Sequence, residues 1–272
     1  MLKTRVLTAA VMLAVVLAAL FLLPRVGWIA FCAVFLGVAA WEWGALTALG
    51  SGARYGYAGL LVGLFALPAL LGRTGATGLY APAWVYYAGA LFWAILVPLW
   101  IWRRPRTQGR SWLLAAGALA LLPAGAALVD LRTVHPWLLF CALGTVWISD
   151  TAAYFVGVHF GRHKLAPSIS PGKTWEGVAG ALAAVALYAL AWGSLGRLAG
   201  IATWPGGAEL WILPVLLGFA VAGMIGDLFE SLIKRQAGVK DSGTFLPGHG
   251  GLLDRIDAPA AMLPFVVIAF VR

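Results

Sequence analysis

Nine apolar runs divide the chain, each between 15 and 23 residues long. A helix needs about 20 apolar residues to cross the hydrocarbon core of a bilayer. Only 11% of the residues are charged and 62% are hydrophobic, whereas a soluble domain carries about 25% charged residues. We therefore predict an all-α fold, a polytopic integral membrane helical bundle with about nine transmembrane helices. The runs cover residues 6–23, 26–46, 57–71, 82–102, 113–129, 136–158, 177–198, 210–226 and 252–271.

The first run follows Lys3 and Arg5, so a signal peptide is an alternative to a membrane helix. The run is longer than the apolar region of a typical signal peptide, and no clear cleavage site of small residues follows it. We interpret it as the first span. The two cysteines, Cys32 and Cys141, lie in apolar runs, so neither a disulfide framework nor a zinc cluster is expected.

Basic residues are concentrated in alternate connections, and this pattern predicts the orientation of the bundle. Lys and Arg are enriched in cytoplasmic loops, so the side that they share, with the N-terminus, is expected to be cytoplasmic and Arg272 to lie outside. The same rule accounts for the net charge of +9, and no nucleic-acid partner is expected. The compact chain leads us to expect a bacterial inner membrane. The basic residues are Arg103, Arg104, Arg106 and Arg110 after the fourth run, Arg162, Lys164 and Lys173 after the sixth, and Lys234, Arg235, Lys240 and Arg255 after the eighth.

Half of the acidic residues of the chain lie in one segment, residues 226–257, which reads GDLFESLIKRQAGVKDSGTFLPGHGGLLDRID. Apolar runs flank it, and burying an isolated ion is very costly. These charges must therefore be solvated, paired or bound to a metal, and we interpret the segment as a chemical site.

Carboxylates in this segment have the spacing of a metal site. Asp227, either Glu230 or Ser231, and Lys234 share one face of a helix, because they are spaced by three or four and then seven residues; an ordinary solvated helix end is the alternative. Asp254 and Asp257 are three residues apart at the start of the last run, and a helix cap explains only one of them. Oxygen ligands of this kind suit Mg2+, which shares its coordination with phosphates.

A glycine-rich stretch lies between these two groups. Gly248, Gly250 and Gly251 surround His249, and they allow backbone conformations in which several N–H groups converge on an anion. A flexible turn with an exposed histidine is the alternative.

A second polar segment begins inside the sixth run. Asp150 and Tyr154 lie one turn apart, and an acid at membrane depth usually faces a polar cavity; a neutral aspartate that joins two helices is the alternative. Lys173 and Thr174 follow in a loop that suits phosphate binding, although positive charge on the inner side explains part of it. The string from Gly172 to Thr174 is not interpreted as a P-loop, because no strand is expected before it. Glu42 lies between two tryptophans, and we expect it at the membrane interface rather than in a cavity.

The C-terminal half resembles the phosphatidate cytidylyltransferase (CDP-diacylglycerol synthase) family. The resemblance rests on well over a dozen positions of one motif and on a second stretch from Ser149 to Gly177. The motif positions are Ser231, Ile233, Lys234, Arg235, Lys240, Asp241, Gly243, Leu246, Pro247, His249, Gly250, Gly251, Leu252, Asp254, Arg255, Ile256 and Asp257.

The resemblance implies an enzyme that transfers the cytidylyl group of CTP to phosphatidic acid, giving CDP-diacylglycerol and pyrophosphate. It further implies an all-helical membrane homodimer with a polar cavity that faces the cytoplasm, a requirement for Mg2+, and a second, monovalent cation such as K+. Metal ligation is carried over to Asp227 and Asp254, and Asp257 is added on spacing alone. The expected catalytic residues are Asp227, Lys234, Asp254 and Asp257, and the expected substrate-binding residues are Asp150, Tyr154, Lys173, Thr174, Ser231, Arg235, Lys240, Asp241, His249, Gly250, Gly251 and Arg255.

The expected organisation is a supporting region with oligomer contacts, residues 1–130, and a catalytic region, residues 131–272, with cytoplasmic loops at 159–176 and 227–257. Two alternatives stay open. A transporter of an anionic lipid or solute requires charges near mid-membrane on several helices, where Asp150 is the clear case. Another membrane CDP-lipid phosphotransferase requires a paired-aspartate motif that this sequence lacks.

Overall fold

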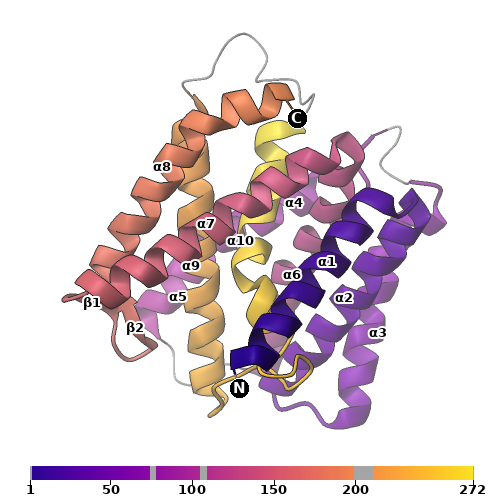
Figure 1. Cartoon of the computed structure of the whole chain (residues 1–272). Helices are drawn as coiled ribbons and strands as arrows, with labels where there is room; N and C mark the ends of the chain where they lie inside the picture. Colours follow the sequence, from indigo (N-terminus) through magenta and orange to yellow (C-terminus); the bar gives the residue numbers. More distant parts are fainter. Residues whose placement is uncertain (1, 74–77, 105–108, 199–210, 272) are drawn as a thin grey trace.

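The computed structural model describes residues 2–73, 78–104, 109–198 and 211–271. Their helices pack into one bundle (Figure 1). The helices are α1 (Leu2–Leu22), α2 (Arg25–Leu46), α3 (Ser51–Leu70), α4 (Ala83–Leu91), the π-helical η1 (Phe92–Leu96), α5 (Val97–Arg103), α6 (Arg110–Val134), α7 (Pro136–Phe160), α8 (Trp175–Leu198), α9 (Ile212–Gln236) and α10 (Leu253–Phe270).

The described helices form nine rods, because α4, η1 and α5 are continuous from Ala83 to Arg103. Seven rods are long and apolar enough to cross a membrane. The other two are α1, whose described apolar part is Leu7–Leu22, and α10, which carries Asp254, Arg255 and Asp257. The predicted all-α, polytopic membrane bundle is confirmed.

Hydropathy located the rods but not the polar end of α9. The helix α9 continues to Gln236, beyond the end of the apolar run at Gly226, because its last turns carry the polar residues of the motif. The predicted loop 227–257 is therefore only residues 237–252, which we call the α9–α10 loop.

The predicted loop 159–176 contains an antiparallel hairpin of β1 (Lys164–Ala166) and β2 (Ser170–Thr174). The expectation that no strand precedes Gly172 was wrong, since β1 does. The string from Gly172 to Thr174 still differs from a P-loop, because it lies within β2 rather than in a loop before a helix.

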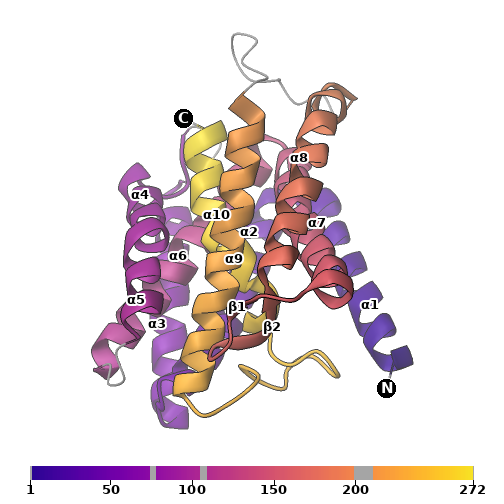
Figure 2. The same cartoon turned by 90° about the vertical axis from the view of Figure 1, so that its left-hand side faces the viewer.

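The connections that carry predicted site residues lie at one end of the bundle. The start of α1, the β1–β2 hairpin and the α9–α10 loop all lie there, whereas α10 ends at the opposite end (Figures 1 and 2). We call it the loop-bearing end. This arrangement matches the alternation of basic connections; Arg106 and Arg272 fall outside the described residues.

The last helix, α10, runs through the middle of the bundle (Figure 1) and packs against α9, α6, α4, α7 and α2. Its closest approach to α9 is at Gly226, where a Cβ atom would lie only 2.5 Å from the backbone oxygen of Asp257. Small residues allow such close helix contacts in membranes. Gly226 thus sets the distance between the two helices that carry most of the polar motif.

An aromatic cluster packs around Phe229 of α9. The ring centroids of Trp43, Phe92, Trp93 and Trp100 lie 5.4 to 6.1 Å from that of Phe229. Phe229 is two residues after Asp227 and so points away from it on the helix. The cluster fixes the rotation of α9 and leaves its polar face free.

Candidate active site between α9, α10 and the hairpin

Lys234 lies between two carboxylates near the end of α9. Its Nζ atom is 2.8 Å from Oε2 of Glu230 and 2.5 Å from Oδ1 of Asp254, in the first turn of α10. Only 8% of Lys234 is exposed, and a buried ammonium group needs such partners because an isolated buried charge is costly. The three side chains form an ion triad that joins α9 to α10.

Asp254 also binds the backbone of the α9–α10 loop. Its Oδ2 atom accepts hydrogen bonds from the N–H groups of Gly251 at 2.8 Å and Ser242 at 3.0 Å. Gly250 has a φ of +80°, and a Cβ atom there would lie 2.6 Å from the same oxygen. The N–H groups of this glycine-rich loop therefore converge on the protein's own carboxylate.

Asp227 faces the hairpin. Its Oδ2 atom is 2.7 Å from Nζ of Lys173, in β2, and its Oδ1 atom accepts a hydrogen bond from the hydroxyl of Ser231 at 3.3 Å. The Asp227 and Lys173 side chains are 35% and 24% exposed, so water and a dissolved ligand reach both. A cation on β2 and an anion on α9 thus share an accessible position.

Two further acidic residues lie near the Asp227–Lys173 pair. Asp150, on α7, is exposed and interacts electrostatically with Asp227 and Lys173. Asp257, on α10, is an electrostatic neighbour of Asp227 and of the ion triad. Acids from three helices therefore lie around the polar face of α9.

Contacts with the first turn of α8 hold the two ends of the hairpin in place. Glu176, in the first turn of α8, accepts hydrogen bonds from the N–H groups of Arg162 and His163. Thr174 is buried, and its hydroxyl oxygen accepts the N–H of Gly177. This hydroxyl therefore caps α8, a structural role that the sequence analysis did not consider.

The remaining predicted residues lie around the loop-bearing end. Arg235 donates to the backbone oxygens of Ile169 and Val239, so it bridges the hairpin and the α9–α10 loop. Arg255 donates to the backbone oxygen of His249. Lys240 and Asp241 are exposed on the loop. Tyr154 is 66% exposed on α7, and its ring packs against Phe155.

Sequence reasoning missed the role of Glu42. It is completely buried, and it accepts hydrogen bonds from the α9–α10 loop and the start of α10. Its placement between Trp41 and Trp43 suggested an interface, but only Trp43 is buried beside it. The partners are mostly backbone N–H groups, and these leave no side-chain pattern in a sequence.

The carboxylate oxygens at the site are suitable ligands for a hard cation. Among the described residues, no group of three or more Asp, Glu, His or Cys side chains is assembled to hold a metal ion alone. Mg2+ commonly takes one or two carboxylates and completes its coordination with water and phosphates, so a smaller set is sufficient. The buried Oε1 atom of Glu230 has no hydrogen-bond donor among the described residues, and the side chain of Asp257 lies within hydrogen-bonding reach of Glu230. Either a cation or a proton shared by the two acids would satisfy this oxygen.

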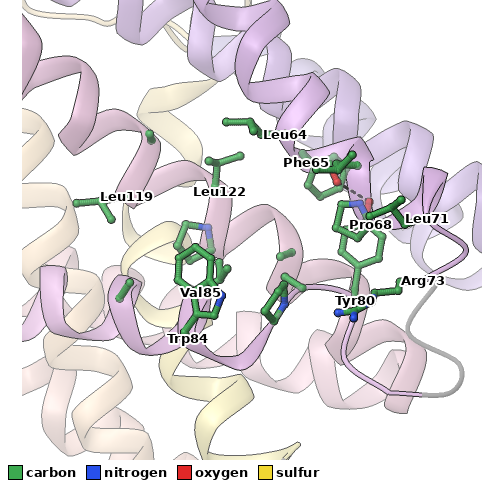
Figure 3. A pocket seen from close by; sticks show the side chains of 17 residues that line it. Leu64, Phe65, Pro68, Leu71, Arg73, Tyr80, Trp84, Val85, Leu119 and Leu122 are labelled. Carbon is green, nitrogen blue, oxygen red and sulfur yellow. Dashed lines mark hydrogen bonds between the residues drawn. The ribbon is translucent and has the colours of Figure 1, made fainter.

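A separate apolar cavity lies between α3, α4 and α6 (Figure 3). Its volume is about 490 Å3, and Arg73 is the charged residue among those that line it. The candidate site residues are absent from its lining, so it is not part of the polar site.

Comparison with known proteins gives a family match over nearly the whole chain. A family model described as the cytidylyltransferase family matches residues 3–271. A phosphatidate cytidylyltransferase of Pseudomonas aeruginosa is 40% identical over 97% of this chain and 95% of its own length. One of Haemophilus influenzae is 36% identical over 97% of both chains. One of Mycobacterium bovis is 35% identical over 93% of this chain and 84% of its own length.

Proposed function

The chain belongs to the cytidylyltransferase family, and we infer that it transfers the cytidylyl group of CTP to phosphatidic acid, giving CDP-diacylglycerol and pyrophosphate in phospholipid synthesis. The observation that carries this function is the full-length similarity to several phosphatidate cytidylyltransferases. The geometry agrees with it. The lysines and carboxylates of the motif gather at one end of a membrane bundle, where a lipid headgroup and a dissolved nucleotide can both arrive.

The reaction needs charge neutralisation more than it needs a base. An oxygen of the phosphatidic acid phosphate attacks the α-phosphorus of CTP, and the bond from that phosphorus to the pyrophosphate oxygen breaks. The attacking phosphate already carries negative charge, so no strong general base is required. The main obstacle is repulsion between two anions, which positioned cations reduce.

We propose that Lys173 and Lys234 supply part of that positive charge. Lys173 is partly exposed beside Asp227 and is therefore placed to meet a phosphate. Lys234 is buried in the ion triad, so its charge acts mainly by holding Asp254 in place. Arg235, Lys240 and Arg255 line the same end of the bundle and add to its attraction for anions.

We propose that Asp227 and Asp254 hold Mg2+, with Asp257 close by. A bound Mg2+ would neutralise the triphosphate and stabilise the leaving pyrophosphate. The acceptor Oε1 of Glu230 lacks a donor among the described residues and its side chain lies beside the carboxyl group of Asp257, so we propose that a second cation such as K+ binds at this pair of acids.

We further propose that the loop-bearing end faces the cytoplasm of a bacterial inner membrane and that the enzyme works as a homodimer. The positive-inside rule supports the orientation, because the basic connections share this end. A cytoplasmic site also meets CTP where it is made. The dimer rests on the family resemblance and is tested by the mass of the purified protein in detergent.

The decisive experiment incubates the purified protein with labelled CTP, phosphatidic acid and Mg2+, and looks for a labelled CDP-lipid. Formation of that lipid with release of pyrophosphate supports the function. A transporter would form no covalent product, and a CDP-lipid phosphotransferase would release CMP from added CDP-lipid instead. The Asp227→Asn and Asp254→Asn variants should lose turnover while staying folded; near-normal activity in either would refute the ligand role of that residue.

A further inference from the structure

Glu42 is a buried carboxylate that belongs to the first half of the chain but binds the last part of it. It lies in α2 and is 0% exposed. Its Oε2 atom accepts the hydroxyl of Ser242 at 3.1 Å and the N–H of Leu253 at 2.8 Å, and its Oε1 atom accepts the N–H of Leu252 at 3.0 Å. Three donors from the α9–α10 loop and the start of α10 therefore satisfy one carboxylate.

The loop leaves room for this carboxylate through two glycines. A Cβ atom on Gly243 would lie 2.6 Å from Oε1 of Glu42, and one on Gly251 would lie 2.6 Å from Oε2. Contacts this short do not occur with real Cβ atoms. Both glycines belong to the polar motif, so part of its glycine pattern is explained by the space that Glu42 occupies.

Ser242 connects Glu42 to the proposed metal ligand. Its hydroxyl donates to Glu42, and its backbone N–H donates to Asp254 at 3.0 Å. Leu252 and Leu253, whose N–H groups Glu42 accepts, directly precede Asp254 in the chain. The backbone that carries Asp254 is therefore held on one side by Glu42.

Packing alone would not need a charge at this place. Replacing buried ionic groups by apolar ones is often neutral or stabilising, so a buried carboxylate is a poor choice for packing alone. A carboxylate does suit the start of a helix, where free N–H groups carry partial positive charge. Here that helix is the one that presents Asp254 and Asp257.

We propose that Glu42 is a positioning residue for nucleotidyl transfer: it fixes the α9–α10 loop and the first turn of α10, and thereby the orientation of Asp254. The proposal deepens the proposed function and rests on it for the activity readout. Residues that orient metal ligands typically change metal affinity by about 10- to 100-fold when they are replaced.

The test compares Glu42→Gln with Asp130→Asn. The glutamine keeps one acceptor oxygen but turns an amide donor toward an N–H group, and it removes the charge. Asp130 is a matched control. It is a buried carboxylate in α6 that accepts hydrogen bonds from Tyr80 and Tyr86, away from the polar motif. Both variants should lose some thermal stability in detergent.

Only Glu42→Gln should alter the site. We expect the Mg2+ concentration for half-maximal CDP-lipid formation to rise by about 10- to 100-fold, with little change for Asp130→Asn. Amide hydrogen exchange supplies a readout independent of activity: protection should fall across residues 242–254 in Glu42→Gln but not in Asp130→Asn. Ser242→Ala, which removes a single bond to Glu42, should shift both readouts in the same direction by less.

The results separate this proposal from the proposed function. If the wild-type protein makes no CDP-lipid, the proposed function fails, and exchange across residues 242–254 still decides whether Glu42 holds the α9–α10 loop and the first turn of α10. If Glu42→Gln matches Asp130→Asn in both metal dependence and exchange, Glu42 contributes stability only and the proposal is overturned. If Glu42→Gln does not fold, the same comparison is made with Ser242→Ala, and wild-type values in that variant overturn it.

Discussion

Gly226 lies where α9 and α10 come closest, one residue before the proposed metal ligand Asp227. A Cβ atom at Gly226 would lie 2.5 Å from the backbone oxygen of Asp257, whereas ordinary contact begins at 3.4 Å. The difference is 0.9 Å, and the obstructing atom belongs to the backbone, so Gly226→Ala must push the two helices apart by a distance of this order. The two helices carry Asp227 and Asp254, so their carboxylates should separate as well.

The expected effect is large on activity and modest on stability. Overpacking a core costs about 1 to 3 kcal/mol, and replacing a helical glycine by alanine returns about 1 kcal/mol through helix propensity. Misplacement of catalytic groups by about 1 Å can lower the rate about 100-fold. We therefore expect kcat/KM for CDP-lipid formation to fall about 100-fold, with a small change in Tm.

Gly223→Ala is the matched control. Gly223 lies one turn earlier on the same face of α9, and its Cβ atom would lie 3.5 Å from Cβ of Ala258, which is ordinary contact. It gains the same helix propensity without moving α10, so its activity should stay near that of the wild type. A Gly226→Ala enzyme that works as well as Gly223→Ala would refute the claim that this crossing sets the geometry of the site.

Three further predictions concern charge and loop packing. Lys173→Met should lower kcat/KM by about 10- to 100-fold, the effect of losing a charged hydrogen bond, whereas Lys164→Met, an equal charge change in the same hairpin, should stay near the wild type. Removing divalent ions with EDTA should stop turnover, and added Mg2+ should restore it; turnover that persists in EDTA would contradict the metal proposal. Gly251→Ala should lower thermal stability and activity together, because its Cβ atom would clash with the Ser242 hydroxyl oxygen and would lie 2.6 Å from Oε2 of Glu42; an unchanged Tm would contradict that packing.

The sequence predicted the bundle well because its signal is local. Runs of apolar residues identify spans whatever their neighbours are, and a four-residue spacing places Ser231 beside Asp227 on any helix. The structure confirms that spacing, since the Ser231 hydroxyl donates to Asp227. Apolar runs show where a chain crosses the membrane and not where a helix ends. They therefore predicted an end at Gly226, although α9 continues to Gln236.

The contacts that assemble the site are not local, and sequence patterns did not predict them. Glu42 meets partners 200 or more residues away, two of which are backbone N–H groups. The strand β2 contains Pro171 and Gly172, which are residues that strands usually avoid, so it was expected to be a loop. The Lys173–Asp227 pair depends on that hairpin and could not be predicted without it.

The contact between Glu42 and α10 also orders events during synthesis. Leu252 is 210 residues after Glu42, and ribosomes add about 5 to 20 residues per second, so α2 waits for roughly 10 to 40 seconds before its partner exists. A buried carboxylate is costly while it lacks hydrogen-bond donors. The nascent protein therefore holds an acid whose final partners are absent until the last helix has been made.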